Sequence, residues 1–283
     1  MRHVGTIGIV RPETVVRVGG WHGCEPVRSV VCNVEAEETV LDPTLTVLLY
    51  SSVAALTAAF GVLPLLSGRR PPNAWMGWAN ALAGGLMLGV AYALLVAGLE
   101  VDALRVGAGA LMGVAVVWGS HALIGTADLD LNQLDDVRPE YGYQVIVVNS
   151  LHAAHEGVAI GIAMAVSLPF GILMALSLAV HNIPEATVMS AVVTRRGVSL
   201  RSAAVLAVAT NALQVLLAVV TFSIALAAPA FLPWALGFAV GALIYLVLVE
   251  LLPESYREAG HTSIALVTIA AMGVVVLLRA RAG

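Results

Sequence analysis

Residues 231–252 read FLPWALGFAVGALIYLVLVELL, an apolar run whose single charged residue is Glu250. A run of this length matches the roughly 20 residues that an α-helix needs to cross a hydrocarbon layer. Similar runs recur from Leu45 onward, separated by short polar breaks. The expected spans are 45–66, 74–98, 103–124, 143–167, 170–194, 200–227, 231–252 and 262–280. The sequence therefore predicts an all-α membrane protein with eight transmembrane helices.

The composition agrees with this class of protein. Hydrophobic residues make up 59% of the 283 residues and charged residues only 11%, whereas a soluble domain usually carries about 25% charged residues. A chain this apolar could not cover a surface that faces water. The sequence also lacks a basic stripe interleaved with aromatic residues, so we expect it to contact a lipid bilayer and no nucleic acid.

The N-terminal segment, residues 1–42, is polar and stands apart from the apolar spans. It lacks the apolar stretch behind a basic start that a signal peptide requires. Its two cysteines, Cys24 and Cys32, favour neither a disulfide nor a pair of free thiols. We expect a poorly ordered tail over residues 1–42 and one eight-helix transmembrane domain over residues 43–283.

The distribution of arginines predicts the orientation of the helices. The loops between spans one and two, three and four, five and six, and seven and eight contain most of the arginines. These are Arg69, Arg70, Arg138, Arg195, Arg196, Arg201 and Arg257. The intervening loops hold Arg105 alone, while Arg279 and Arg281 at the C-terminal end argue mildly for the opposite orientation. Arginine is enriched in short cytoplasmic loops. We therefore expect both termini to lie outside the cytoplasm, in an inner or plasma membrane.

Two spans carry ionisable side chains of a kind that membrane helices rarely tolerate. The fourth span contains His152 and Glu156, and the fifth contains His181 and Glu185. A spacing of four residues places both side chains of a pair on one helix face, about 40° apart and one turn along. Two such helices packed face to face would present two imidazoles and two carboxylates to one ion. This donor set suits zinc, iron(II) or manganese(II).

The alternative is that these residues form two buried His–Glu pairs that only hold helices together. The repetition of the pattern on consecutive spans, both at mid-depth, argues against this alternative. Pro184 lies between His181 and Glu185, where it removes a backbone donor and kinks the helix. Bent helices at mid-membrane are where transporters place their sites, although a kink used only for packing is also open.

Three further ionisable residues have less defined roles. His155 lies about 60° from His152 on the helix face, where it could support a ligand, act as an auxiliary ligand, or be a satisfied core histidine. Glu250, at the expected cytoplasmic end of the seventh span, could be a gate ligand or a carboxylate solvated near the headgroups. His121, at the end of the third span, is interpreted as an interfacial residue.

These motifs resemble those of the ZIP (Zrt/Irt-like) family of divalent metal transporters, in its prokaryotic form. The family pattern is His-Asn-x-Pro-Glu-Gly on both helices. Residues 181–185, HNIPE, match this pattern closely, and His152 with Glu156 and Gly157 match its metal-binding ends. The resemblance covers about residues 45–280 and leaves the N-terminal tail outside.

The resemblance implies a 3+2+3 bundle, in which the fourth and fifth spans are enclosed by two groups of three, and a homodimer. It implies transport toward the cytoplasm by alternating access, with zinc as the foremost cargo and iron, manganese or cadmium as alternatives. The metal would be a transported substrate, with no prosthetic group and no enzymatic activity. The implied main ligands are His152, Glu156, His181 and Glu185, and the implied auxiliary residues are Met87, His155, Asn182, Gln214 and Glu250.

The sequence departs from the family pattern at positions that bear on the number of metal ions. Ala153 replaces an asparagine, and His155 replaces the proline of the fourth span. Gln214 stands where binuclear relatives carry a glutamate. A second site would keep Asn182 and Gln214 but lose charge and one ligand, so we expect one ion rather than two.

Two functions from other classes are open on sequence alone. His152, His155 and Glu156 could form the metal-plus-base unit of a membrane-embedded hydrolase. Their order, His-x-x-His-Glu, lacks the glutamate between two ligands that the His-Glu-x-x-His motif requires. A metal sensor that does not transport would need the same ligands as a transporter. The donor set also does not select zinc over iron or manganese.

Overall fold

The computed structural model describes residues 42–67, 72–124 and 139–282. Within these ranges the chain is almost wholly helical and contains no strand, which confirms the prediction of an all-α membrane protein. The predicted tail, apart from Asp42, lies outside the described residues, as do Arg69, Arg70 and Arg138. The orientation inferred from the arginines therefore stays a prediction.

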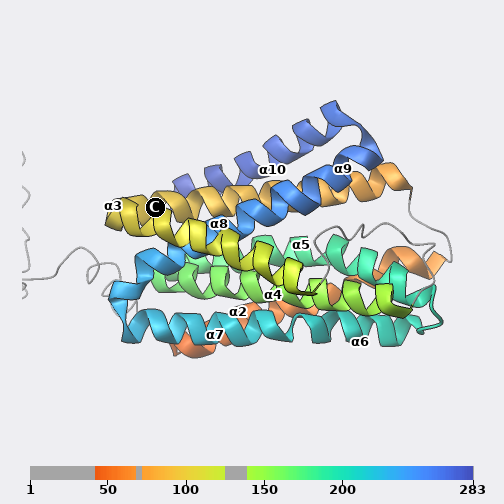
Figure 1. Ribbon diagram of the computed structural model, residues 1–283, viewed down its shortest axis with the longest axis horizontal. Coiled ribbons are helices and arrows are strands. Elements are labelled where there is room, and N and C mark those ends of the chain that lie inside the picture. The colour runs from red at the N-terminus through yellow and green to blue at the C-terminus, as the bar shows by residue number, and fades with distance from the viewer. Residues whose placement is uncertain (1–41, 68–71, 125–138, 283) are drawn as a thin grey trace, which may run out of the picture.

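Figure 1 labels most of the described helices and colours them in chain order. In chain order they are α2 (Pro43–Thr57), the 3-10 helix η1 (Ala58–Ser67), α3 (Asn73–Ile124), α4 (Pro139–Val166), α5 (Leu168–Thr194), α6 (Leu200–Thr210), α7 (Ala212–Ala227), the 3-10 turn η2 (Pro229–Phe231), α8 (Leu232–Leu246), the π-helical turn η3 (Val247–Leu251), α9 (Leu252–Ala259) and α10 (His261–Ala282). Joined across their 3-10 and π segments, they form 7 described helices that are long and apolar enough to cross a membrane.

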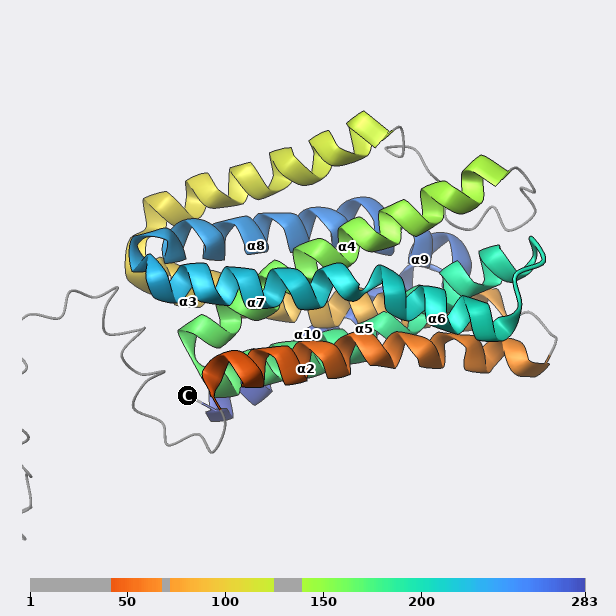
Figure 2. The same cartoon turned by 90° about the horizontal axis from the view of Figure 1, so that it is seen from below.

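Helix α3 contains two passages rather than one. As a straight helix its 52 residues would extend for about 78 Å, more than twice the thickness of a hydrocarbon core. The backbone of Asp102 is not helical (φ −162°, ψ 98°), and a Cβ placed on Gly98 would lie 2.7 Å from the side chain of Val106. The chain therefore turns back at Asp102, and Figure 2 shows the second half of α3 leaving this turn beside α8. α3 covers the expected spans 74–98 and 103–124.

Close glycine contacts sort the helices into two sets. Gly61 packs against the backbone of α5, and Gly157 against that of α7. Gly109 and Gly241 bring α3 and α8 together, while Gly85 packs against α10. A Cβ at any of these glycines would clash with its neighbour, and in lipid such small residues let helix backbones approach closely. Each tight contact of a described glycine falls within one set.

We name these groups the α4 set (α2, η1, α4, α5, α6 and α7) and the α8 set (α3, α8, η3, α9 and α10). In Figure 1 the α8 set forms the upper layer and most of the α4 set the lower layer. Both predicted motifs lie in the α4 set, on α4 and α5. The boundary between the two sets is therefore where the motif helices face the rest of the bundle.

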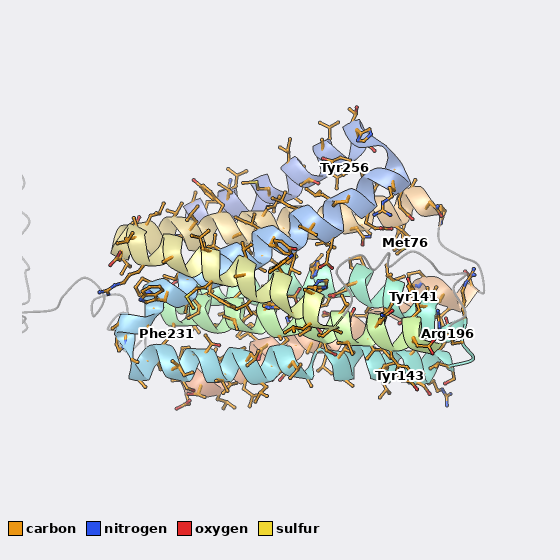
Figure 3. All side chains as sticks on the ribbon, in the orientation of Figure 1. Met76, Tyr141, Tyr143, Arg196, Phe231 and Tyr256 are labelled. Atoms are coloured by element: carbon orange, nitrogen blue, oxygen red, sulfur yellow. The ribbon has the colours of Figure 1, made fainter. Side chains whose placement is uncertain are left out.

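The two ends of the bundle differ in packing. Figure 3 shows Phe231 at one end and Tyr141 with Arg196 at the other, and we call these the Phe231 end and the Arg196 end. The largest apolar core lies toward the Phe231 end and joins both sets. Its fully buried side chains include Leu94, Ile162 and Leu236. The half of the bundle on the Phe231 side is thus closed to solvent by close packing.

Regular α geometry is lost at three places in the bundle. α2 changes to a 3-10 helix at Ala58, α6 and α7 are separated at Asn211, and α8 continues into the π-helical turn 247–251. α5 contains Pro184 but stays helical through it. Irregular backbone inside a membrane is tolerated where it is buried in protein or lines a polar cavity. The π-helical turn carries Glu250, and the break in α2 lies beside the Ala54 carbonyl, which accepts from Asn182.

Candidate metal centre

Helices α4 and α5 form a hairpin that brings the two motifs together. α4 ends at Val166, and Ser167 caps α5 with extended backbone (φ −162°, ψ 146°) and a side chain that accepts from the amide of Phe170. Because the helices then run in opposite directions, the histidine of each motif lies level with the glutamate of the other. His152 Nδ1 is 3.1 Å from Glu185 Oε1, and His181 Nε2 is 2.9 Å from Glu156 Oε1.

Three of the four predicted main ligands form one group, which we call the deep cluster: Glu156, His181 and Glu185. One ligand atom from each lies within 4.8 Å of the others. His181 Nε2 also lies 3.5 Å from Glu185 Oε2, so both carboxylates face one imidazole nitrogen. The side chain of Glu156 has no solvent exposure. All three residues come from α4 and α5, so the deep cluster belongs wholly to the α4 set.

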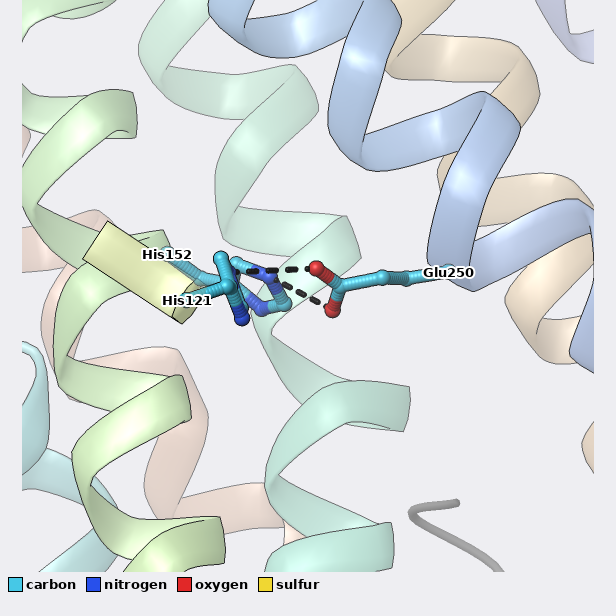
Figure 4. A group of neighbouring side chains, drawn as sticks. All are labelled: His121, His152 and Glu250. Atoms are coloured by element: carbon cyan, nitrogen blue, oxygen red, sulfur yellow. Dashed lines mark ion pairs between the residues drawn. The ribbon is translucent and has the colours of Figure 1, made fainter. Parts of the chain in front are cut away.

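The fourth predicted ligand, His152, lies in a second group, which we call the bridging cluster: His121, His152 and Glu250 (Figure 4). His152 Nε2 is 2.9 Å from Glu250 Oε2, and His121 Nε2 is 3.3 Å from Glu250 Oε1. His121 comes from α3 and Glu250 from η3, so this cluster joins the two helix sets. Its carboxylate is the more hydrated one, because the Glu250 side chain is 18% exposed.

His152 is shared between the two clusters. Its Nδ1 faces Glu185 of the deep cluster and its Nε2 faces Glu250 of the bridging cluster. The two clusters therefore meet at one imidazole ring. A cation that leaves the deep cluster would find the next ligands directly beside it.

His121 is the functional candidate that sequence reasoning missed. The interpretation of this residue as interfacial is wrong, because His121 is 5% exposed and faces Glu250 inside the bundle. Its position near the end of a span was the only sequence signal, and this signal does not reveal the partner on another helix. Glu250, which sequence reasoning left undecided, lies in the same cluster.

The remaining auxiliary candidates fall outside both clusters. Asn182 and Gln214 lie behind Glu156, where the Gln214 Nε2 donates to Glu156 Oε2 at 3.4 Å and the Asn182 Nδ2 donates to Gln214 Oε1 at 3.2 Å. His155 is buried with its ring stacked on Phe238, at 6.2 Å between centroids. Met87 is buried in the large apolar core.

The chemistry of the two clusters suits a divalent transition metal. The deep cluster offers two carboxylates and one imidazole, and the bridging cluster offers one carboxylate and two imidazoles. Mixed nitrogen and oxygen ligands of this kind bind zinc, iron(II) and manganese(II). Buried carboxylates are costly without a countercharge, so a divalent cation between the two of the deep cluster would be strongly attracted.

Comparison with known proteins points to the same chemistry. Residues 130–279 match the family model described as ZIP zinc transporter. The chain is 33% identical over 227 residues to a putative zinc transporter of Arabidopsis thaliana, covering 78% of this chain and 36% of that relative. It is 31% identical over 116 residues to the zinc transporter GufA of Myxococcus xanthus, covering 40% of this chain and 44% of GufA. The matches thus span less than half the length of either relative.

Proposed function

Because the chain belongs to the ZIP family of zinc transporters, we propose that it carries zinc toward the cytoplasm through the two clusters that meet at His152. It is an integral, multi-pass membrane protein that transports metal ions and is not an enzyme. One observation carries the proposal. His152 contacts the deep cluster through one ring nitrogen and the bridging cluster through the other, at the boundary between the two helix sets.

The ion is held first by His152, Glu156, His181 and Glu185. The 2.9 Å and 3.1 Å separations of their cross-helix pairs support this assignment. Iron(II), manganese(II) and cadmium are the competing cargoes, since the ligand set does not exclude them. We expect one ion at a time in this site.

Release takes place past Glu250. The arginine distribution supports assigning the Arg196 end to the cytoplasm. The apolar core packs the Phe231 side of the site, while Glu250 retains solvent contact. We therefore place the exit of the ion on the Arg196 side of the site, past Glu250.

Alternating access follows from movement of the α4 set against the α8 set. The tight glycine contacts lie within each set, so the boundary between the sets is the weaker plane. Such a movement would separate His152 from His121 and Glu250, which belong to the other set. It would leave the deep cluster whole, because that cluster is built from α4 and α5 alone.

The test measures the uptake of radioactive zinc into proteoliposomes. It compares the wild type with a double variant that carries both His181→Ala and Glu185→Ala. We expect the double variant to lose uptake while it keeps the size-exclusion profile of the wild type. Cold iron, manganese and cadmium added as competitors would rank the cargoes. Zinc bound by the wild type without any uptake would instead indicate a sensor. Equal uptake by both proteins would contradict the site.

We also expect a homodimer, which the resemblance to the family supports. A monomeric mass in lipid nanodiscs would contradict this expectation.

The alternative function, a membrane-embedded hydrolase, loses support. His155 stacks on Phe238 and does not join His152 and Glu156 in either cluster.

A further inference from the structure

A chain of hydrogen bonds runs behind the deep cluster, on the side away from the bridging cluster. Gln214 donates its Nε2 to Glu156 Oε2 at 3.4 Å. Asn182 donates its Nδ2 to Gln214 Oε1 at 3.2 Å and to the carbonyl oxygen of Ala54 at 2.8 Å. The Asn182 and Gln214 side chains are buried, at 1% and 0% exposure. The chain thus links α2, α5 and α7 to one carboxylate on α4.

The chemistry of the acceptors determines the direction of every bond in this chain. An ionised carboxylate and a backbone carbonyl can only accept hydrogen bonds. Gln214 must therefore turn its NH2 group toward Glu156, which leaves its oxygen facing Asn182. Asn182 must then donate both N–H groups, and its Oδ1 is left buried without a hydrogen-bond partner among the described residues. Reversing either amide would set two acceptors against each other.

The last acceptor in this chain of hydrogen bonds, the Ala54 carbonyl, lies at the break in α2. In a continuous α-helix the amide of Ala58 would donate to the carbonyl of Ala54. Here α2 gives way to a 3-10 helix, and the Ala58 amide donates to the carbonyls of Ala55 and Leu56 instead. The Ala54 carbonyl accepts instead from the Thr57 hydroxyl at 2.6 Å, and its second lone pair accepts from Asn182 at 2.8 Å. The helix break therefore provides the acceptor that orients the whole chain.

We propose that Asn182 and Gln214 are positioning residues that hold Glu156 as a single-oxygen ligand for the transported ion. The Gln214 amide engages Oε2, so Oε1, which faces His181 at 2.9 Å, is the oxygen presented to the ion. This inference rests on the proposed transport site. The amide on Oε2 competes with a second ion for that oxygen and so favours a single ion on Glu156. Loss of such an outer hydrogen-bond partner typically weakens metal affinity about 10- to 100-fold.

The protein offers a matched control that also starts from α4. Asn149 Nδ2 donates to Thr210 Oγ1 at 3.1 Å, and these residues are 6% and 4% exposed. This bond also joins α4 to the α6–α7 segment and also uses a buried carboxamide. Neither residue contacts Glu156 through any hydrogen bond that the structure shows among the described residues. Asn149→Leu therefore reports the structural cost of losing a buried carboxamide in this part of the bundle.

The test is zinc titration by calorimetry on purified full-length protein in nanodiscs. The proteins are the wild type, Gln214→Met, Asn182→Leu, the double variant and Asn149→Leu. We expect Gln214→Met and Asn182→Leu to bind zinc about 10- to 100-fold more weakly. The double variant should be no weaker than the weaker single, because the two residues act as one chain. Asn149→Leu should stay within about threefold of the wild type.

A spectroscopic measurement separates positioning from general destabilisation. Cobalt(II) added in place of zinc reports its ligand geometry through its visible absorption bands. We expect these bands to change in Gln214→Met and to match the wild type in Asn149→Leu. If Gln214→Met cannot be recovered folded, Asn182→Leu tests the same chain from α5.

Two results would overturn the inference: equal zinc affinities for Gln214→Met and Asn149→Leu, or losses that multiply in the double variant. His181→Ala, titrated in parallel, keeps this outcome distinct from failure of the transport site. If His181→Ala binds zinc as tightly as the wild type, the site itself is wrong. If His181→Ala loses zinc while Gln214→Met keeps it, only the positioning role is wrong.

Discussion

The deep cluster and the bridging cluster use the same residue types but are built differently. The deep cluster draws all of its side chains from two helices of one hairpin, whereas the bridging cluster needs α3, α4 and η3. In the proposed movement of the two helix sets the first would keep its geometry and the second would not. We therefore propose that the deep cluster holds the ion and that the bridging cluster takes part in its release.

The two clusters also differ in charge and hydration. The deep cluster has two carboxylates, and Glu156 has no exposure to solvent. The bridging cluster has one carboxylate, Glu250, whose side chain is 18% exposed. Charges attract a cation more strongly where the surroundings exclude water. We therefore expect the deep cluster to set the affinity for zinc and the bridging cluster to set the rate of transfer.

The largest expected effect is that of Glu156→Gln, which removes a charge from the deep cluster without changing the shape of the side chain. Zinc affinity should fall by more than about 100-fold, because a direct ligand matters more than its hydrogen-bond partners. Uptake should be lost with it. Calorimetry and proteoliposome uptake measure the two quantities. Affinity within threefold of the wild type would show that the deep cluster does not hold the ion.

A smaller effect is expected for Glu250→Gln in the bridging cluster. The deep cluster is intact in this variant, so zinc affinity should change by less than about threefold, while uptake should slow about tenfold. Titration and uptake on the same preparation give both numbers. A drop in affinity as large as that of Glu156→Gln would mean that the two clusters act as one site.

His121→Asn should have a weaker effect still. His121 contacts Glu250 at 3.3 Å, and asparagine keeps a side-chain N–H that can donate to this carboxylate. Uptake should therefore slow about two- to fivefold, and zinc affinity should not change. Initial rates of uptake over a range of zinc concentrations would separate the two effects. A rate equal to that of the wild type would remove His121 from the transfer route.

The smallest effect is expected for His155→Phe, which lies outside both clusters. Its ring already stacks on Phe238, so another aromatic ring should fit, and uptake should stay within about twofold of the wild type. The same uptake assay serves as the measurement. A loss comparable to that of Glu250→Gln would show that His155 meets the ion in another conformation of the protein.

Local sequence patterns determined the class of the protein and all three residues of the deep cluster. The length of an apolar run is set by the thickness of the bilayer, so the membrane-spanning class follows from the sequence alone. A spacing of four residues places a histidine and a glutamate on one helix face whatever the rest of the fold. For this reason His152, Glu156, His181 and Glu185 could be selected before their helices were placed in space.

Only the tertiary structure decided which of these residues lie together. That His152 also turns to Glu250, and that His121 joins them, depends on how α3 and η3 pack against α4. The contact between Gln214 and Glu156 likewise joins residues 58 positions apart. Helix periodicity relates neighbours within a few turns and carries no information on the facing helix. The hairpin at Ser167, the turn at Asp102 and the glycine contacts supplied that information.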